Sequence, residues 1–287
     1  MAISMETKII YSERCLEYGG ISGPENAARV LAAANILKKK EHGFIAPQPA
    51  RDEEILLAHS KEYVEKVKNG SISDPDAPAY DNIYGYAALA AGGAILAAQT
   101  NGFSLMRPPG HHCGINGKAL GAVTRGFCYF NSLAIAVKTM GKNTVIIDID
   151  GHHGNGTQEI FANDKNVTYI SLHRQNVFPQ TGSQACGNCR NYPLNAECGG
   201  KIYLDTFKKA LRENKNEIDA AETIAVSAGF DAHQGDLVSL GLNTKDFNNI
   251  GKEIKKLKKP VFSVLEGGYD GKNLGNDIDA FLKGIEN

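Results

Sequence analysis

The sequence lacks several features that would assign it to a specialised class of protein. Its formal net charge is −1, so no overall electric field draws it toward nucleic acid or an anionic membrane. No apolar run reaches the about 20 residues that a membrane-spanning helix needs. The first eight residues lack the charged and then apolar pattern of a signal peptide. These absences predict a cytoplasmic protein that binds neither nucleic acid nor membrane directly.

Cysteine is also sparse. The six cysteines stand at irregular positions and do not follow the spacing of a disulfide framework. Cys186, Cys189 and Cys198 lie close enough in sequence for a structural metal site or a redox pair, but no fourth ligand is evident and free thiols are the simpler alternative. Repeats, low-complexity tracts and linkers are absent as well. We therefore predict one domain over residues 1–287, with no indication of its oligomeric state.

Apolar strand-like segments alternate with helix-like segments along the chain. The strand-like segments are 8–11, 103–106, 145–147, 167–172, 222–227 and 261–265, and the main helix-like segments are 24–40, 51–55, 60–68, 84–99, 201–214 and 244–258. Residues 71–79 and 183–198 are rich in polar and turn-forming residues and are predicted to be loops, the first of them exposed. The alternation predicts an α/β fold with a mainly parallel sheet covered by helices on both faces.

One stretch, Val145-Ile-Ile-Asp-Ile-Asp-Gly-His-His-Gly-Asn155, carries unusual chemistry at the end of a strand. Side chains at positions i and i+2 of a strand point the same way, so Asp148, Asp150 and His152 would project to one side. Burying two carboxylates and an imidazole together is costly unless a cation lies between them. An isolated Asp-x-Asp more often ends a strand and caps the next helix, but His152 at the next alternate position favours a divalent metal.

Polar residues follow the ends of five predicted strands: His111 and His112, Asp148 to His152, His173, Asp231, and Tyr269. The carboxyl ends of parallel strands share one edge of a sheet, where ligands bind. Asp150, His152 and Asp231 would give one imidazole and two carboxylates with open positions, as in catalytic zinc sites. Nitrogen and oxygen ligands would also accept Fe(II) or Co(II).

The neighbouring His111 and His112 need a different role, because adjacent side chains usually face apart. Two imidazoles beside a metal-bound water suit general base and general acid catalysis. Each needs an acceptor for its far ring nitrogen, and Asp148 and Asn155 are available. Tyr269 lies after two glycines and could reach a substrate carbonyl; a partly buried structural tyrosine is the alternative.

Six motifs in order resemble those of the histone deacetylase and acetylpolyamine amidohydrolase family. They are Arg107-Pro-Pro-Gly-His-His, Gly126-Phe-Cys-Tyr-Phe-Asn, Asp148-Ile-Asp-Gly-His-His-Gly-Asn-Gly-Thr-Gln158, Phe178-Pro-Gln-Thr-Gly182, Gly229-Phe-Asp231 and Glu266-Gly-Gly-Tyr269. The resemblance implies a single arginase-like deacetylase domain with an eight-stranded, mainly parallel sheet. Asn155, where some members have aspartate, resembles the class II and bacterial branches.

The resemblance also implies a role for each residue in these motifs. Asp150, His152 and Asp231 correspond to zinc ligands, His112 to the general base, His111 to its electrostatic and proton-donating neighbour, and Tyr269 to the phenol that polarises the scissile carbonyl. Further counterparts are the substrate contacts Asp76, Gly126, Phe127, Phe178 and Val238, the exit-channel Arg29, and a potassium site at Asp148, Asp150, His152, Ser171 and Leu172. Asp148 and Asn155 correspond to the residues that orient the two histidines.

Three departures from the family pattern bear on the substrate. Gly151 replaces a bulkier residue between two ligands, which we expect to loosen that turn. The loop 113–125 is longer than usual and is expected near the tunnel mouth. Val238 is apolar where polyamine-selective relatives can carry glutamate, which disfavours acetylpolyamines. We therefore predict removal of acyl groups from lysine ε-amines of proteins or peptides, with small acyl-amines as the alternative substrates and a two-metal ureohydrolase or a non-catalytic binder as alternative classes.

Overall fold

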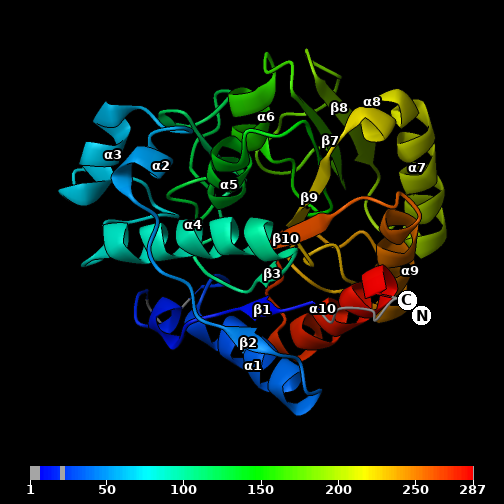
Figure 1. The fold of residues 1–287 in the computed structure, drawn as a ribbon, viewed down its shortest axis with the longest axis horizontal. Helices are drawn as coiled ribbons and strands as arrows, with labels where there is room; N and C mark the ends of the chain where they lie inside the picture. Colours follow the sequence, from blue (N-terminus) through cyan, green and yellow to red (C-terminus); the bar gives the residue numbers. More distant parts are fainter. Residues whose placement is uncertain (1–6, 20–22, 287) are drawn as a thin grey trace.

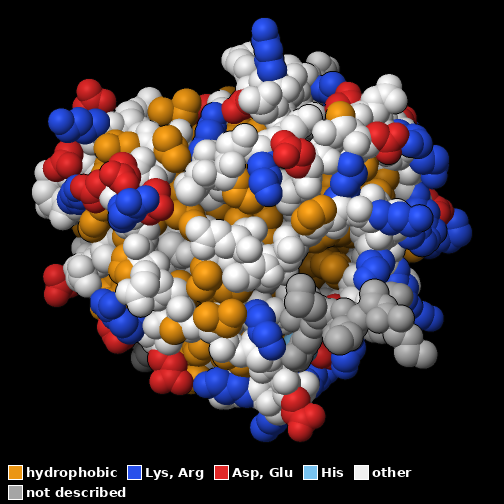
Figure 2. Space-filling model, in the orientation of Figure 1, with side chains coloured by type: hydrophobic (Ala, Val, Ile, Leu, Met, Phe, Trp, Pro, Cys, Tyr) orange, Lys and Arg blue, Asp and Glu red, His pale blue; other side chains and the backbone are white. Residues whose placement is uncertain are grey.

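The computed structural model describes residues 7–19 and 23–286 (Figure 1). Residues 1–6, on which most of the signal-peptide prediction depends, lie outside the described residues. In the part of the chain that is described, no helix combines the length and apolar character needed to cross a membrane. On the face shown in Figure 2, basic and acidic side chains are interspersed, as expected for a net charge of −1.

Eight strands form one fully parallel sheet, in the order β2-β1-β3-β10-β9-β6-β7-β8. This confirms the predicted α/β architecture. The strands are β1 (Ile9–Ile10), β2 (Phe44–Ile45), β3 (Phe103–Ser104), β6 (Thr144–Asp148), β7 (Val167–Arg174), β8 (Cys189–Leu194), β9 (Thr223–Ala228) and β10 (Val261–Leu265).

Helices cover both faces of the sheet. One face carries α1 (Ala27–Lys39), α7 (Gly199–Glu213), α8 (Lys215–Ala220), α9 (Thr244–Lys255) and α10 (Gly271–Glu286), and the other carries α2 (Asp52–Ile55), α3 (Lys61–Lys68), α4 (Ile83–Thr100), α5 (Ser132–Met140) and α6 (Asn155–Phe161). A short 3-10 helix, η1 (Glu13–Leu16), follows β1. In Figure 1, β1 lies between α4 on one side and α1 with α10 on the other.

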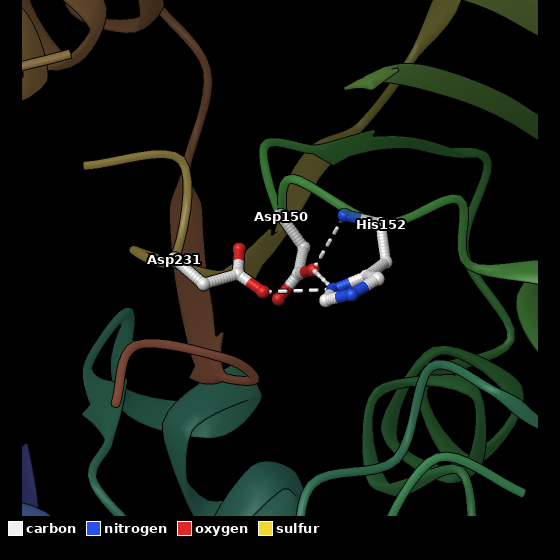
Figure 3. A group of neighbouring side chains, drawn as sticks. All are labelled: Asp150, His152 and Asp231. Atoms are coloured by element: carbon white, nitrogen blue, oxygen red, sulfur yellow. Dashed lines mark hydrogen bonds and ion pairs between the residues drawn. The ribbon is translucent and has the colours of Figure 1, made fainter. Parts of the chain in front are cut away.

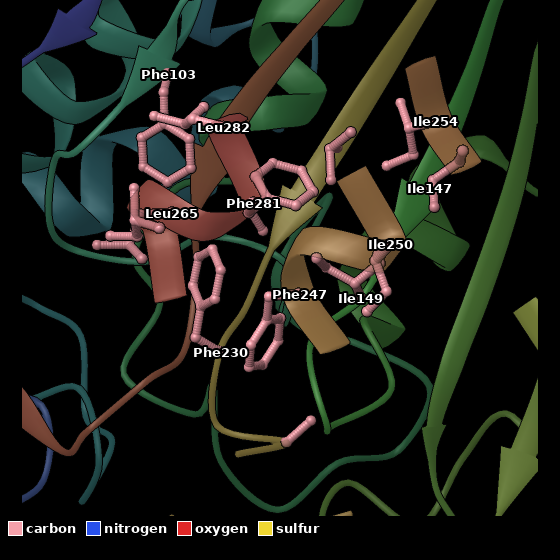
Figure 4. Packing of buried hydrophobic residues seen from close by; sticks show 14 of the residues in the cluster. Phe103, Ile147, Ile149, Phe230, Phe247, Ile250, Ile254, Leu265, Phe281 and Leu282 are labelled. Atoms are coloured by element: carbon pink, nitrogen blue, oxygen red, sulfur yellow. The ribbon is translucent and has the colours of Figure 1, made fainter. Parts of the chain in front are cut away.

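Two hydrophobic clusters fill the space between the sheet and its helices. Val145 and Ile147 of β6 belong to one cluster and Ile146 to the other, because successive side chains of a strand point to opposite faces. Figure 4 shows the first cluster, in which the ring of Phe230 lies 5.0 Å from that of Phe247 in α9. Since Phe230 immediately precedes Asp231, this packing fixes the segment that follows β9.

The structure corrects parts of the predicted secondary structure. Residues 183–198 are not all loop, because β8 pairs with β7 along the sheet edge. Pro193 lies in β8, and a proline is tolerated there because an edge strand has one unpaired side. The predicted loop 113–125 contains a hairpin, β4 (Cys113–Gly114) with β5 (Gly117–Lys118), and β2 was not predicted. Residues 71–79 form a loop, but not a fully exposed one, because Asp74 and Ala77 are buried.

A buried ion-pair network joins the start of α1 to the carboxyl edge of the sheet. Both carboxylate oxygens of Glu25 accept hydrogen bonds from Arg107, at 2.8 and 2.7 Å. Arg29 lies 3.3 Å from the same carboxylate and also donates to the carbonyls of Glu266 and Gly268. The network therefore holds α1, the segment after β3 and the segment after β10 in fixed relation.

We predict that Glu25→Ala lowers the free energy of unfolding by about 3–5 kcal/mol, since it leaves two buried guanidinium groups without their carboxylate. Burial alone would raise the pKa of Glu25, but the hydrogen bond from Arg107 and the charge of Arg29 outweigh it and lower that pKa. The contribution is therefore present at neutral pH and is lost as the pH falls through the folded-state pKa. Urea unfolding at pH 7 measures the change.

Glu13→Ala is the matched control for Glu25→Ala. The Glu13 carboxylate is 75% exposed and lies 3.5 Å from the Lys38 ammonium. Such a surface pair contributes at most about 1 kcal/mol. Equal effects of the two substitutions would contradict a structural role for the buried network.

Candidate active site

Three side chains that could ligate a metal ion meet at the carboxyl edge of the sheet (Figure 3). Asp150 and His152 follow β6, and Asp231 follows β9, the neighbouring strand. Their ligand atoms all lie within 4.8 Å of one another. Nδ1 of His152 lies 2.8 Å from Oδ2 of Asp231 and 3.3 Å from Oδ1 of Asp150. Two segments distant in sequence thus form one cluster of donors.

The donor set fits a divalent metal ion. Oδ2 of Asp231 is buried and has no partner of good hydrogen-bond geometry among the described residues, since its contact with Nδ1 of His152 is an ion-pair distance without that geometry. The other oxygens are held by backbone amides: Gly151 donates to Oδ1 of Asp231 and Gly267 donates to Oδ2 of Asp150. The oxygen left without a donor therefore lies beside the imidazole, where a cation would bind. One imidazole and two carboxylates suit zinc and also Fe(II) or Co(II).

The electrostatics of the cluster indicate excess negative charge. Burial, and then the charge of Asp150, raise the pKa of Asp231 to about 6. Burial lowers the pKa of His152, but the carboxylates of Asp231 and Asp150 outweigh it and raise that pKa to about 9. Both shifts show that the buried carboxylates favour a positive charge between them. A bound divalent cation would supply that charge.

The tandem histidines lie beside this cluster in opposite electrostatic environments. Nδ1 of His111 lies 3.1 Å from Asp148, whereas Nδ1 of His112 lies 2.8 Å from Oδ1 of Asn155. Burial lowers the pKa of His111, but the carboxylates of Asp150 and Asp148 outweigh it and raise that pKa to about 10. Burial, and then the positive charges on His111 and His152, lower the pKa of His112 well below its usual value. The surroundings thus favour the cationic form of His111 and the neutral form of His112, which separates a proton donor from a proton acceptor.

A cavity of about 330 Å³ opens above the metal-ligating cluster. His112, His152 and Tyr269 line it together with the aromatic rings of Phe127 and Phe178. Burial, and then the charges of the nearby aspartates, raise the pKa of Tyr269 well above its usual value. The phenol therefore keeps its proton and can donate a hydrogen bond to a ligand in the cavity.

Comparison with known proteins identifies the family of this chain. The model of the histone deacetylase domain matches residues 23–285. The chain belongs to the histone deacetylase family. A probable deacetylase of Archaeoglobus fulgidus is 33% identical, over 92% of this chain and 82% of that protein.

Other relatives of this histone deacetylase family protein carry different names. An acetylpolyamine amidohydrolase of Mycoplana ramosa is 35% identical over 67% of this chain and 58% of its own length. The crystal structure of the HDA15 HD domain superimposes with a TM-score of 0.86 and 30% identity, covering 96% of this chain and 90% of that one. The family thus includes proteins named for two kinds of substrate.

The predicted substrate-contact residues of this histone deacetylase family protein come together in the structure. All of them line the cavity: Asp76, Gly126, Phe127, Phe178 and Val238. Val177 and Leu237 also line it and were not predicted. The sequence could have indicated both residues, because each is the chain neighbour of a predicted substrate-contact residue, Phe178 or Val238.

The remaining predicted residues lie around this centre. The guanidinium of Arg29 lies 5.3 Å from the ring centre of Tyr269. Asp148 and Ser171 are paired in register on β6 and β7, with Leu172 next along the strand, and Oγ of Ser171 lies 2.8 Å from Nδ1 of His173.

The three cysteines that suggested a metal site or a redox pair are free thiols. The backbones of Cys186 and Cys189 exchange two hydrogen bonds across a tight turn, and the side chain of Cys186 is exposed. Among the described residues, Asp150, His152 and Asp231 form the one group of three potential metal ligands, so these cysteines belong to no such group.

Glu266 is a site residue that the sequence reasoning did not single out. Its buried carboxylate accepts hydrogen bonds from the amides of Gly110 and His111, at 2.7 and 3.0 Å. Burial raises the pKa of Glu266 to about 7. A charged residue directly after the apolar strand β10 was the signal, because such a side chain needs buried partners. Glu266 fixes the backbone of the tandem histidines relative to the Tyr269 loop.

Gly151 does not loosen the turn between the two ligands, contrary to expectation. A Cβ atom at this position would lie 2.1 Å from Cγ1 of Val238, so the valine side chain occupies the space that a larger residue would fill. The Gly151 amide also donates to Asp231 at 2.8 Å. The absence of a side chain allows close packing, which keeps the turn and the loop of Val238 together.

We predict that Gly151→Ala destabilises the protein by about 1–3 kcal/mol through overpacking. We also expect it to weaken the affinity for a divalent metal ion, because Val238 must then shift the loop that carries Asp231. Thermal unfolding and zinc titration measure the two effects. Adding Val238→Ala removes Cγ1 and should restore much of the lost stability. It should restore less of the metal affinity, because a Cβ at position 151 would still lie 3.0 Å from Oδ1 of Asp231.

Gly271→Ala is the control for this substitution, because a Cβ there would meet its nearest atom at an ordinary 3.4 Å. If the effects of Gly151→Ala and Val238→Ala simply add in the double variant, the proposed packing of Val238 on Gly151 is contradicted.

Proposed function

We propose that this protein is a zinc-dependent hydrolase that removes acetyl or other acyl groups from the ε-amine of lysine in proteins or peptides. One observation carries the proposal. A single cavity is lined by His152 of the three-residue cluster, by His112 of the tandem histidines and by the phenol of Tyr269, which keeps its proton. The surroundings of the two histidines favour opposite charges, with His111 cationic and His112 neutral. These are the groups that amide hydrolysis requires: activation of water, proton transfer and stabilisation of the oxyanion.

The residues of the cavity divide the reaction between them. Asp150, His152 and Asp231 would hold zinc, which when bound lowers the pKa of water to about 7 and polarises a carbonyl oxygen. His112, kept neutral, accepts the proton of the attacking water. Tyr269 donates a hydrogen bond to the amide oxygen as negative charge develops there. A protonated histidine then gives a proton to the leaving amine, and His111 is held in the protonated form by its carboxylate neighbours.

The walls of the cavity favour an acyl-lysine stem over a polyamine. Phe127 and Phe178 provide aromatic surface for an aliphatic chain, and Val238 adds apolar surface. Among the described residues that line the cavity, Asp76 alone is a carboxylate. Asp76 is exposed, accepts a hydrogen bond from Thr124 at 2.6 Å and can accept hydrogen bonds from a substrate backbone at the rim. Residues 113–125 supply none of the lining residues identified, and Thr124 of this loop reaches the rim through its hydrogen bond to Asp76.

Acetylated polyamines and other small acyl-amines remain the second candidate substrates. The relative named acetylpolyamine amidohydrolase, 35% identical over its matched region, supports this alternative. A two-metal ureohydrolase is less well supported, because the described residues contain one group of three metal ligands rather than two. A non-catalytic binder is also less well supported, since such a protein has no use for a general base and a protonated phenol.

A monovalent cation, such as potassium, would complete the environment behind the zinc ligands. The proposed ligands are Asp148, Asp150, His152, Ser171 and Leu172. Their proximity on β6, β7 and the segment after β6 supports this proposal.

Tyr269→Phe is expected to lower kcat for an acetyl-lysine peptide about 10²–10³-fold, because one preorganised donor to the oxyanion is lost. Zinc content should stay unchanged, since the phenol is not among the ligand atoms. Tyr192→Phe is the control, because the Tyr192 hydroxyl bonds to Glu213 away from the cavity. Unchanged turnover of Tyr269→Phe would contradict the mechanism.

Removal of the metal by a chelator should abolish hydrolysis of the peptide, and addition of Zn²⁺, Fe²⁺ or Co²⁺ in turn should restore it. Metal content per chain should be near one for the catalytic site. Hydrolysis at the full rate by the metal-free protein would contradict a metal-dependent function. A stoichiometry of two transition-metal ions per chain would favour the ureohydrolase alternative.

We expect kcat/KM for an acetyl-lysine peptide to exceed that for acetylputrescine by at least about tenfold, which corresponds to about 1.4 kcal/mol of transition-state binding. The reason is the apolar cavity wall, which offers a distal ammonium group no carboxylate besides Asp76. Parallel assays of both substrates, and of longer acyl chains on the same peptide, measure the preference. The opposite order would favour the small acyl-amine alternative.

A further inference from the structure

The segment that follows the tandem histidines forms a compact structure against α6. It begins with the β4–β5 hairpin and continues in a turn at residues 119–122, where the amide of Ala122 donates to the carbonyl of Ala119. Both central residues of the turn have positive φ, Leu120 at 50° and Gly121 at 79°. Leucine rarely adopts this conformation, so the surroundings must hold the turn in place.

The Ala119 carbonyl contacts the residue that orients His112. Nδ2 of Asn155 donates to this carbonyl at 2.8 Å, while Oδ1 of Asn155 lies 2.8 Å from Nδ1 of His112. Asn155 and His112 are both buried. A chain of two hydrogen bonds thus connects the turn to the ring of the tandem histidine that lines the cavity.

This chain of contacts determines which nitrogen of His112 carries the proton. A side-chain amide has a donor end and an acceptor end, and either could face an imidazole. A backbone carbonyl only accepts, so Ala119 requires the NH₂ group of Asn155 and leaves the amide oxygen for His112. Nδ1 of His112 must then carry its hydrogen, and Nε2 keeps the lone pair with which a general base accepts a proton.

Glu159 holds the hairpin and the turn in this geometry. It lies one helical turn after Asn155 in α6, and its two carboxylate oxygens accept hydrogen bonds from the amides of Ile115 and Leu120, at 3.0 and 3.3 Å. The contact is close, because a Cβ atom at Gly114 would lie 2.3 Å from Oε1 of Glu159. The strained residue Leu120 is therefore one of the two that the carboxylate anchors.

We propose that Glu159 is a positioning residue which, through the 113–122 segment and the Ala119 carbonyl, fixes the amide of Asn155 and thereby the base-competent tautomer of His112. The inference rests on the proposed function, since it assigns His112 the role of general base. It gives the long loop a catalytic purpose that does not depend on contact with substrate. An asparagine at position 155 can turn either the oxygen or the NH₂ group of its amide toward His112. In this proposal the 113–122 segment fixes that orientation.

The first test is the tautomer itself. In zinc-loaded protein labelled with ¹⁵N-histidine, the ring of His112, assigned by comparison with His112→Ala, should show a protonated Nδ1 and an unprotonated Nε2. Glu159→Ala should shift this ring toward the Nε2-protonated form or a mixture. It should also lower kcat about tenfold or more, as loss of an outer hydrogen-bond partner commonly does, with KM and zinc content unchanged.

The second test is suppression by Asn155→Asp. A carboxylate has no donor end, so an aspartate can only accept the Nδ1–H of His112, whatever the loop does. In the Asn155→Asp background, Glu159→Ala should therefore change kcat less than about twofold. Glu159→Gln, which keeps one acceptor, should lose less than Glu159→Ala. Glu222→Ala is the matched control, because its carboxylate also accepts a backbone amide, from Asn143, at the opposite edge of the sheet.

Two results would overturn the proposal. One is an unchanged His112 tautomer and kcat in Glu159→Ala. The other is an equal loss of kcat with and without the Asn155→Asp substitution, which would make the carboxylate a purely structural anchor. If the unsubstituted protein does not hydrolyse an acyl-lysine peptide, the proposed function fails, but the ¹⁵N spectra of Glu159→Ala still decide whether Glu159 positions His112.

Discussion

Four buried carboxylates at one edge of the sheet set the main physical constraint on this structure. Asp148, Asp150, Asp231 and Glu266 are each at most 1% exposed. Buried charge is stable only when hydrogen bonds and opposite charges compensate it. Backbone amides of Gly151, Gly267, Gly110 and His111 supply hydrogen bonds, and the imidazole of His111 and a metal ion would supply positive charge. The loops after β3, β6, β9 and β10 are fixed because each provides either one of these carboxylates or part of its compensation.

The same constraint separates the roles of two adjacent histidines. His111 lies against carboxylates and is favoured as a cation, and that charge in turn disfavours a second cation on His112. At Nδ1 the two rings also differ in their hydrogen-bond partner, which is the carboxylate of Asp148 for His111 and the amide of Asn155 for His112. An amide fixes the tautomer of an imidazole less firmly than a carboxylate does, since it can rotate to present either its oxygen or its NH₂ group. Ala119 and Glu159 address that weakness, which explains why a chain with asparagine at position 155 has so many contacts between α6 and the 113–122 segment.

The sequence predicted those parts of the fold and site that depend on local patterns. Long apolar strands and the all-round apolar α4 were recognisable, as was a cluster of donors after strand ends. The edge strand β8 was missed because it contains the polar residues Arg190 and Asn191 and also Pro193, a composition that is typical of loops. Glu266 and Glu159 were missed because their partners are backbone amides. Every residue except proline has such an amide, so no residue type in the sequence marks those contacts.

Gly151 illustrates how a departure from a family pattern is understood only with its spatial partner. Considered alone, a glycine between two metal ligands predicts a loose turn. In the structure, Val238 fills the position of the missing side chain and lines the cavity at the same time. A substitution of Val238 therefore affects the packing at Gly151. Because the Gly151 amide donates to Asp231, that substitution also affects the position of Asp231. The cavity wall cannot vary independently of the metal site here, so substitutions that alter substrate preference at Val238 must also preserve the packing that holds Asp231.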